Sequence, residues 1–261
     1  MKYLLLILFL FFSFSNLYSA ETYGNADRYD VTIKQIQICE NATISSETSF
    51  SVSNCVTLGN STLTVDIASA SVGASLGKYA DTTAMIQGRT YRYFVPTLGR
   101  TFVLTGGGSF TKLSDSSSGT CNTDEDATIA SNSAHLTEKT GKVGGTATAA
   151  TFYIPSATSS GVQCRNQDCS HSTGILTFSH DLPDTTSLYG NAINVPSTAD
   201  DFSMIYTLTT PFTVGETVPI INMQFGTQNA IKINPLRDNR GNDTCNIGPY
   251  YPKFRVTVLN P

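Results

Sequence analysis

The stretch Tyr29-Asp30-Val31-Thr32-Ile33-Lys34-Gln35-Ile36-Gln37-Ile38 decides the fold class. Its apolar and polar residues alternate, which is the period of a half-buried β-strand, whereas a helix repeats its apolar residues every three to four positions. The alternation slips by one position between Ile33 and Ile36, and such a slip would turn the later apolar side chains to the opposite face. We therefore predict a strand with a β-bulge near Gln35.

Short alternating runs recur along the chain, and stretches with a helical period are nearly absent. Gly, Asn and Pro residues separate these runs, as hairpins and loops require. Pro96 is predicted to mark a sheet edge or a bend, and Leu98-Gly99-Arg100 a turn. Many short strands at even spacing predict an all-β sandwich or barrel. The runs are residues 29–38, 63–67, 91–95, 102–104, 204–208, 221–225 and 254–258.

The middle of the chain has a different composition. Residues 105–150 contain the clusters Gly106-Gly107-Gly108, Ser116-Ser117-Ser118-Gly119 and Gly144-Gly145, with few large apolar side chains. Such a stretch buries too little apolar surface to order itself. Short strands resume near residues 151–154 and 175–178. We therefore predict one β-sandwich domain over residues 21–261, with a long polar surface insertion at about residues 105–200.

The first twenty residues are typical of a secretion signal. Lys2 supplies the positive charge, and the apolar run Leu4–Phe12 is too short to span a bilayer as a helix. Cleavage is predicted after Ser19 or Ala20, and an uncleaved anchor is the alternative. No second long apolar run follows, so we expect no membrane span in the mature chain and an address at the cell surface, in the periplasm or outside the cell.

The cysteine count fits this export. Six cysteines in an oxidising compartment predict three disulfides, although fifteen connectivities exist. Proximity in the chain favours Cys39 with Cys55 and Cys164 with Cys169, which leaves Cys121 with Cys245.

The charge of the chain argues against one class of partner. Its formal net charge is −4, only 14% of its residues are charged, and it has no Lys/Arg cluster. Because nucleic-acid binding requires basic side chains that neutralise phosphates, we expect no nucleic-acid partner.

Several segments resemble a family of bacterial exported domains whose function is unknown and whose members often sit on surface lipoproteins. The resemblance covers residues 28–104 and 202–260, and it implies an immunoglobulin-like or prealbumin-like sandwich and a surface address. It carries no catalytic residues. The predicted insertion, the cysteines and the absence of a cysteine near the cleavage site depart from the family pattern. The matching segments are 31–38, Val65-Asp66-Ile67-Ala68-Ser69, Gly88-Arg89-Thr90-Tyr91, Met223-Gln224-Phe225-Gly226-Thr227 and Pro252-Lys253-Phe254-Arg255-Val256-Thr257-Val258.

One motif suggests a serine nucleophile. Gly73-Ala74-Ser75-Leu76-Gly77 matches the G-x-S-x-G elbow, which places its serine between a strand and a helix. Residues 78–87 show no helical period, and the glycine run at 106–108 that would form an oxyanion loop comes after the serine instead of before it. A flexible loop is the simpler interpretation.

Two polar clusters suggest metal ions. Cys164, Cys169, His171 and His180 offer thiol and imidazole ligands of the kind that zinc takes, but a disulfide explains the two cysteines without metal. Asp124-Glu125-Asp126 offers the hard oxygens that calcium prefers, yet it lacks the D-x-D-x-D-G spacing. We predict no metal and no cofactor.

Two further patterns concern glycans. Asn41-Ala42-Thr43, Asn60-Ser61-Thr62 and Asn242-Asp243-Thr244 are glycosylation acceptors where the host has the enzymes. A second set of residues suits sugar stacking, although packing in a strand is the preferred interpretation of its aromatic alternation. This set is Tyr91, Tyr93, Tyr250 and Tyr251.

These patterns favour a non-enzymatic function. Our first hypothesis is an exported structural or adhesive surface module that assembles through its strand edges, with Glu21–Asp27 as a donor arm, and whose partners are itself, other surface proteins or glycans. The second is a secreted or periplasmic module that binds glycans or small ligands, at the insertion or at Tyr250-Tyr251. The third is a hydrolase that uses Ser75.

Overall fold

The computed structural model describes residues 20–46, 49–69, 80–128, 138–153, 188–194, 201–217, 219–250 and 253–259. Over these ranges the chain is almost entirely β-strand, with one short 3-10 turn, η2 (Thr82–Ala84), and no α-helix. None of their helical segments is long and apolar enough to cross a bilayer. The strands are β1 (Thr22–Ser46), β2 (Ser49–Gly59), β3 (Leu63–Asp66), β4 (Thr90–Thr111), β5 (Ser118–Asn122), β6 (Lys139–Thr140), β7 (Lys142–Val143), β8 (Ala150–Tyr153), β9 (Leu188–Asn194), β10 (Asp201–Thr213), β11 (Ile220–Gly226), β12 (Ile231–Arg237), β13 (Asp243–Pro249) and β14 (Lys253–Leu259).

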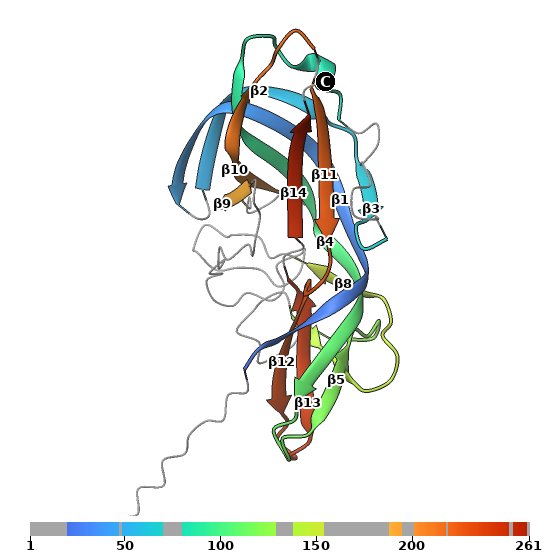
Figure 1. Ribbon diagram of the computed structural model, residues 1–261. Helices are drawn as coiled ribbons and strands as arrows, with labels where there is room; N and C mark the ends of the chain where they lie inside the picture. Colours follow the sequence, from blue (N-terminus) through green and yellow to red (C-terminus); the bar gives the residue numbers. More distant parts are fainter. Residues whose placement is uncertain are drawn as a thin grey trace, which may run out of the picture.

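Two long antiparallel strands, β1 and β4, form a spine along the length of the molecule (Figure 1). They pair from Cys39 opposite Tyr93 at one end to Asn25 opposite Gly107 at the other. On the side away from β4, β1 pairs in succession with β12, β3 and β2. On the side away from β1, β4 pairs with β5, β8 and β10. Six shorter strands therefore attach directly to the spine, three on each side.

The bulge predicted near Gln35 is confirmed. The register between β1 and β4 shifts between Val31 and Ile33 and again between Ile33 and Gln35. As a result the apolar residues on both sides of the slip, from Tyr29 to Ile38, are buried in one core. The bulge keeps the later apolar side chains on the core side of the sheet, whereas a one-residue slip without it would turn them to the opposite side.

One expectation about β4 is wrong, and one of the two alternatives for Pro96 is excluded. Leu98-Gly99-Arg100 is not a turn, because β4 continues through it and Gly99 pairs with Asp201 of β10. A Cβ on Gly99 would lie 3.2 Å from the Cβ of Thr32, so this glycine serves close packing against β1. Pro96 is not at an edge either, since it lies opposite Ile36 while β10 pairs with the residues around it.

The described part of the predicted insertion is built into the sheet. Residues 105–111 complete β4, and β5, β7 and β8 pair with one another or with β4, while β6 pairs with β13. The strand expected near residues 151–154 is β8, whereas the one near 175–178 lies outside the described residues.

The glycine run of β4 explains how this part of the chain fits into the sheet. A Cβ on Gly106 would lie 2.3 Å from the carbonyl oxygen of Asn25, and one on Gly108 would lie 2.7 Å from the Cα of Gly24. A Cβ on Gly24 would itself lie 2.2 Å from the carbonyl oxygen of Gly107. These glycines therefore allow β1 and β4 to approach where side chains would keep the backbones apart.

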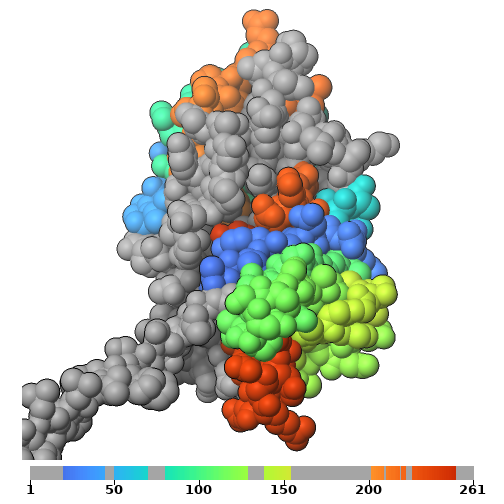
Figure 2. All heavy atoms as spheres, turned by 60° about the horizontal axis from the view of Figure 1, so that its bottom comes forward, coloured from blue at the N-terminus to red at the C-terminus, as the bar shows by residue number. Residues whose placement is uncertain are grey.

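The lower end of the molecule is almost a closed barrel. The sheet runs β5-β4-β1-β12-β13, β7 pairs with β5, and β6 pairs with β13. Figure 2 shows that these segments lie next to one another when this end faces the viewer. A disulfide between Cys121 of β5 and Cys245 of β13 links the two sides. At the upper end β2 contacts β9, and the separate β11–β14 pair adds Ile221 to the core.

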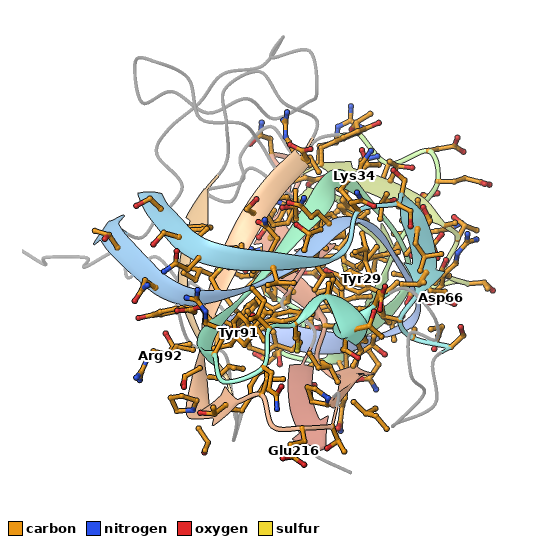
Figure 3. All side chains as sticks on the ribbon, turned by 90° about the horizontal axis from the view of Figure 1, so that it is seen from above. Tyr29, Lys34, Asp66, Tyr91, Arg92 and Glu216 are labelled. Atoms are coloured by element: carbon orange, nitrogen blue, oxygen red, sulfur yellow. A yellow bond between two sulfur atoms is a disulfide. The ribbon has the colours of Figure 1, made fainter. Side chains whose placement is uncertain are left out.

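One core runs through both ends. Tyr29 packs edge-on against Phe102, with 5.9 Å between ring centroids, and Phe102 also contacts Phe202 of β10. Tyr29 and Tyr91 lie inside the molecule, and Lys34 and Arg92 point away from it (Figure 3). The lower barrel is filled by the aliphatic side chains of Ile231, Ile233 and Ile247.

The backbone approach at Gly24 gives the first testable prediction. We expect Gly24→Ala to reduce the free energy of unfolding by at least about 3 kcal/mol, the upper range for an overpacked site, because the new methyl meets backbone atoms that cannot move aside. For a chain of this size this corresponds to a fall in Tm of at least about 6 °C. Thermal unfolding followed by circular dichroism measures it.

Gly215→Ala is the matched control. A Cβ on Gly215 has no atom within 4 Å, and we expect this variant to unfold within about 0.5 kcal/mol of the native chain. Equal unfolding temperatures for the two alanine variants would contradict the packing described for the spine.

Candidate functional site

Several of the motifs found in the sequence lie outside the described residues. These are the serine motif at residues 73–77, Cys164, Cys169, His171, His180, Tyr251 and the first nineteen residues of the predicted signal. The glycine run that would have served as an oxyanion loop is described, and it is part of β4. The Gly106 N–H donates to the hydroxyl of Thr123 at 3.1 Å, and its carbonyl oxygen accepts from the Thr123 N–H at 2.9 Å. The N–H and the carbonyl oxygen of Gly106 are therefore both already engaged in hydrogen bonds.

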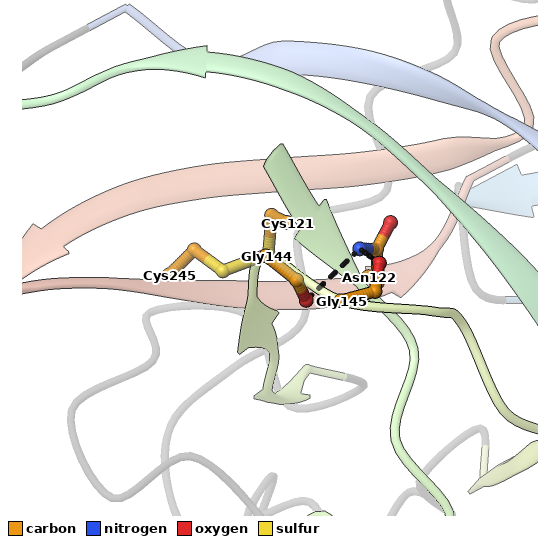
Figure 4. Close-up of a disulfide and its surroundings, with 5 residues drawn as sticks. All are labelled: Cys121, Asn122, Gly144, Gly145 and Cys245. Carbon is orange, nitrogen blue, oxygen red and sulfur yellow. Dashed lines mark hydrogen bonds between the residues drawn. A yellow bond between two sulfur atoms is a disulfide. The ribbon is translucent and has the colours of Figure 1, made fainter. Parts of the chain in front are cut away.

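The described residues hold two disulfides: Cys39–Cys55, the pair that proximity in the sequence favoured, and Cys121–Cys245, the pair that the other two assignments left over. Cys39 and Cys55 are directly opposite in the β1–β2 ladder, and Cys121 bonds to Cys245 across the lower barrel. Beside the second bridge, the Asn122 amide donates to the carbonyl oxygens of Gly144 and Gly145, at 3.3 and 3.0 Å (Figure 4). The two disulfides indicate an oxidising environment outside the cytoplasm.

The lower bridge closes a much longer loop than the upper one. The two cysteine pairs are separated by 124 and 16 residues. In the chain-entropy description, replacing Cys121 and Cys245 by Ala should cost about 5 kcal/mol and replacing Cys39 and Cys55 about 3 kcal/mol. Urea unfolding of the two double variants tests this order, and a smaller loss for the lower bridge would contradict it.

The acidic cluster at residues 124–126 forms a turn. The Glu125 N–H donates to the hydroxyl of Thr148 at 2.9 Å, and the Ala127 N–H donates to the Asp124 carbonyl oxygen at 3.0 Å. The side chains of Glu125 and Asp126 are exposed. In the part of the chain that the structure describes, no group of three or more His, Cys, Asp and Glu residues is placed to hold a metal.

The glycosylation acceptors and tyrosines differ in accessibility. Asn41, Asn60 and Asn242 are exposed. Tyr91 is fully buried against Phe212, and its hydroxyl accepts from the N–H of Ile86. Tyr91 is therefore a core residue, as the packing interpretation expected, and Tyr93 packs against the second buried cluster, around Cys39 and Val95.

Two aspartates act through hydrogen bonds to backbone. Asp66, in the Val65–Ser69 segment that carried the family resemblance, accepts from the N–H groups of Tyr29 and Ala68 and so fixes the end of β3 against β1. Asp243 accepts from the N–H groups of Leu113 and Ser114 and from the Ser114 hydroxyl. It thereby ties the β4–β5 turn to β13.

The outer face of the lower barrel brings together residues that the sequence analysis did not connect. We use "outer face" for Glu21, Tyr23, Lys232, Asn234 and Tyr250, and the same side of the sheet continues to Asn246, which is only 4% exposed. Tyr23 lies opposite Lys232, Lys232 opposite Gly248, and Asn234 opposite Asn246. Because opposite residues of a ladder point to the same side of a sheet, these side chains share one face, with Ile231 and Ile233 on the other.

Tyr23 and Tyr250 form an aromatic pair on this face. Their ring centroids are 4.7 Å apart with an interplanar angle of 50°, and 41% of the Tyr23 surface is exposed. Partial burial, followed by its interactions with Tyr250 and Glu21, raises the pKa of the Tyr23 hydroxyl to about 12. This hydroxyl is therefore protonated at any physiological pH.

The segment Glu21–Asp27 does not form a separate donor arm in this structure. Thr22–Gly24 pair with β12, and Asn25 and Ala26 pair with β4. Glu21 forms an ion pair with Lys232 at 2.6 Å. The polar composition suggested an arm ahead of the first strand, but small residues allow the segment to fit between two strands of its own chain.

The comparisons with known proteins give no relative: no family model, no curated protein and no solved structure matches this chain.

The contacts of Asp243 predict how stability depends on pH. The hydroxyl and N–H of Ser114 and the N–H of Leu113 lower the pKa of Asp243 below its usual value of 3.8. A lowered folded-state pKa gives stability that is complete above the unfolded-state pKa and is lost as the pH falls through the folded value. We expect Asp243→Asn to be less stable than the native chain at pH 7, and this difference to shrink below about pH 4. Urea unfolding at pH 7 and pH 3 tests it, and a difference that grows in acid would contradict it.

Proposed function

We propose that this chain is an exported structural or adhesive module of the cell surface. One observation carries the proposal: one disulfide joins β1 to β2 and another joins β5 to β13, in a fold built almost entirely of strands. Such bonds persist outside the cytoplasm, and they suit a protein that must keep its shape without chaperones or cellular reductants. The proposal assigns no enzymatic activity and no cofactor to the chain.

The sheet offers edges for self-association. Among the described strands, β2 pairs only with β1 and β9 only with β10. Ser51 and Ser53 on β2 are exposed, and an exposed strand edge can accept a strand from a second molecule. We therefore propose that copies of the chain associate through the β2 edge. An immunoglobulin-like or prealbumin-like sandwich over the single domain is part of the same proposal.

The association is testable by placing charge on the edge. We expect sedimentation velocity of the native protein to show concentration-dependent association and Ser53→Lys to weaken it at least about tenfold, since charged edge residues oppose strand addition. Asn60→Lys is the control, because it adds the same charge at an exposed position after β2 ends.

Two results would contradict the proposal. A native protein that remains monomeric at the highest attainable concentration contradicts self-association. A chain that resists protease on intact cells but is cleaved after permeabilisation contradicts the surface address.

A glycan-binding or ligand-binding module is the second candidate. A specific observation favours it, namely the partly exposed Tyr23 ring in contact with Tyr250. Tyrosines in contact with solvent supply large apolar rings with a polar tip, a combination that is common at binding surfaces.

A further inference from the structure

The tyrosine pair lies on rigid elements. Tyr23 lies in β1, where it pairs with Lys232 of β12, and Tyr250 directly follows β13. The Tyr250 N–H donates to the Ala230 carbonyl oxygen at 2.8 Å, and the Tyr250 carbonyl oxygen accepts from the Tyr29 hydroxyl at 3.2 Å. The backbone beneath the rings is therefore fixed on both sides, which reduces the entropy that a bound ligand would otherwise cost.

Hydrogen-bonding side chains continue along the same face. Asn234, two residues after Lys232, is half-buried, and its side-chain N–H donates to a carboxylate oxygen of Glu138. Glu138 is only 2% exposed, so this contact holds the amide in one orientation. A side-chain amide has a further N–H and an oxygen acceptor, which suit hydroxyl groups.

The charges on this face point to the class of ligand. Glu21 and Lys232 are joined in an ion pair, so their charges offset each other. A face whose basic group is already paired offers no unpaired cation among these side chains to attract a carboxylated or sulfated sugar. An aromatic ring beside amide and paired charges instead suits a neutral sugar, whose C–H groups pack on the ring while its hydroxyls form hydrogen bonds.

We propose that the outer face binds a neutral oligosaccharide, with Tyr23 as the stacking residue and Asn234 and the Glu21–Lys232 pair as its hydrogen-bonding groups. The inference rests on the proposed adhesive function, for which it names the ligand class. Binding at this face and association at the β2 edge use different strands, so either can fail without the other.

Calorimetric titration of the purified chain tests the proposal. The probes are two neutral hexasaccharides, of β-1,4-linked glucose and of β-1,4-linked N-acetylglucosamine, and the acidic hexasaccharide of galacturonic acid. We expect at least one neutral probe to bind with a Kd below about 1 mM and more tightly than the acidic probe. Failure of both neutral probes, or tighter binding of the acidic one, would overturn the proposal.

Variants locate the binding. Tyr23→Ala should weaken the neutral probe at least about tenfold, whereas Tyr23→Phe, which keeps the ring, should bind within about threefold of the native chain. Ile86→Ala is the matched control. Ile86 is 52% exposed, and it lies just before β4, in a part of the chain that contributes no residue to the outer face. Equal affinity of Tyr23→Ala and Ile86→Ala would overturn the assignment to this face.

A charge variant keeps the test valid if Tyr23→Ala does not fold. Glu21→Gln removes the carboxylate that pairs with Lys232, at a position where the Glu21 side chain is 44% exposed. We expect the ratio of acidic to neutral affinity to rise at least about threefold. An unchanged ratio would overturn the role of the Glu21–Lys232 pair, and sedimentation of the same variants reports separately on self-association.

Discussion

The pairing of β1 with β4 is the interaction on which the rest of the structure depends. It extends over most of both strands, from Cys39 to Asn25, and every other strand of the main sheet attaches to it directly or through one or two intermediate strands. Strands this long twist strongly, so flanking strands attached along their length need not lie in one plane. The spine can therefore support a nearly closed barrel at one end and a curved sheet at the other.

Close backbone contact makes the lower end possible. Gly24 in β1 and the glycines at 106–108 in β4 lie where the Cβ of any other residue would meet main-chain atoms. Gly141 adds the same constraint beside the bridge, since a Cβ there would lie 2.4 Å from the Cys121 sulfur. The barrel thus combines glycines, which permit the approach, with a disulfide, which prevents the long intervening chain from separating β5 and β13 in the unfolded state.

Alternation in the sequence predicted the strands but not their partners. The alternation located the apolar residues on both sides of the bulge in β1 and the bulge itself, because a strand that buries one face has an apolar residue at every second position. It failed at Gly106–Gly108, because a glycine that packs closely and a glycine in a loop look the same in a sequence. The edge alternative for Pro96 failed for a related reason, since local rules assign proline to edges and the pairing of β4 with two neighbours is long-range information.

The candidate site was partly visible in the sequence. Tyr250 was considered for sugar stacking, but its ring partner Tyr23 is 227 positions away in the chain and only the β1–β12 pairing brings it close. Lys232 and Asn234 alternate with Ile231 and Ile233, so they lie on the opposite face of the strand from the residues that fill the barrel, and both are partly buried there. The same strand therefore contributes to stability through one face and presents polar side chains on the other. Because the inner face fixes the backbone, the outer side chains are held in place at little further entropic cost, which is the condition for a binding surface on strands instead of loops.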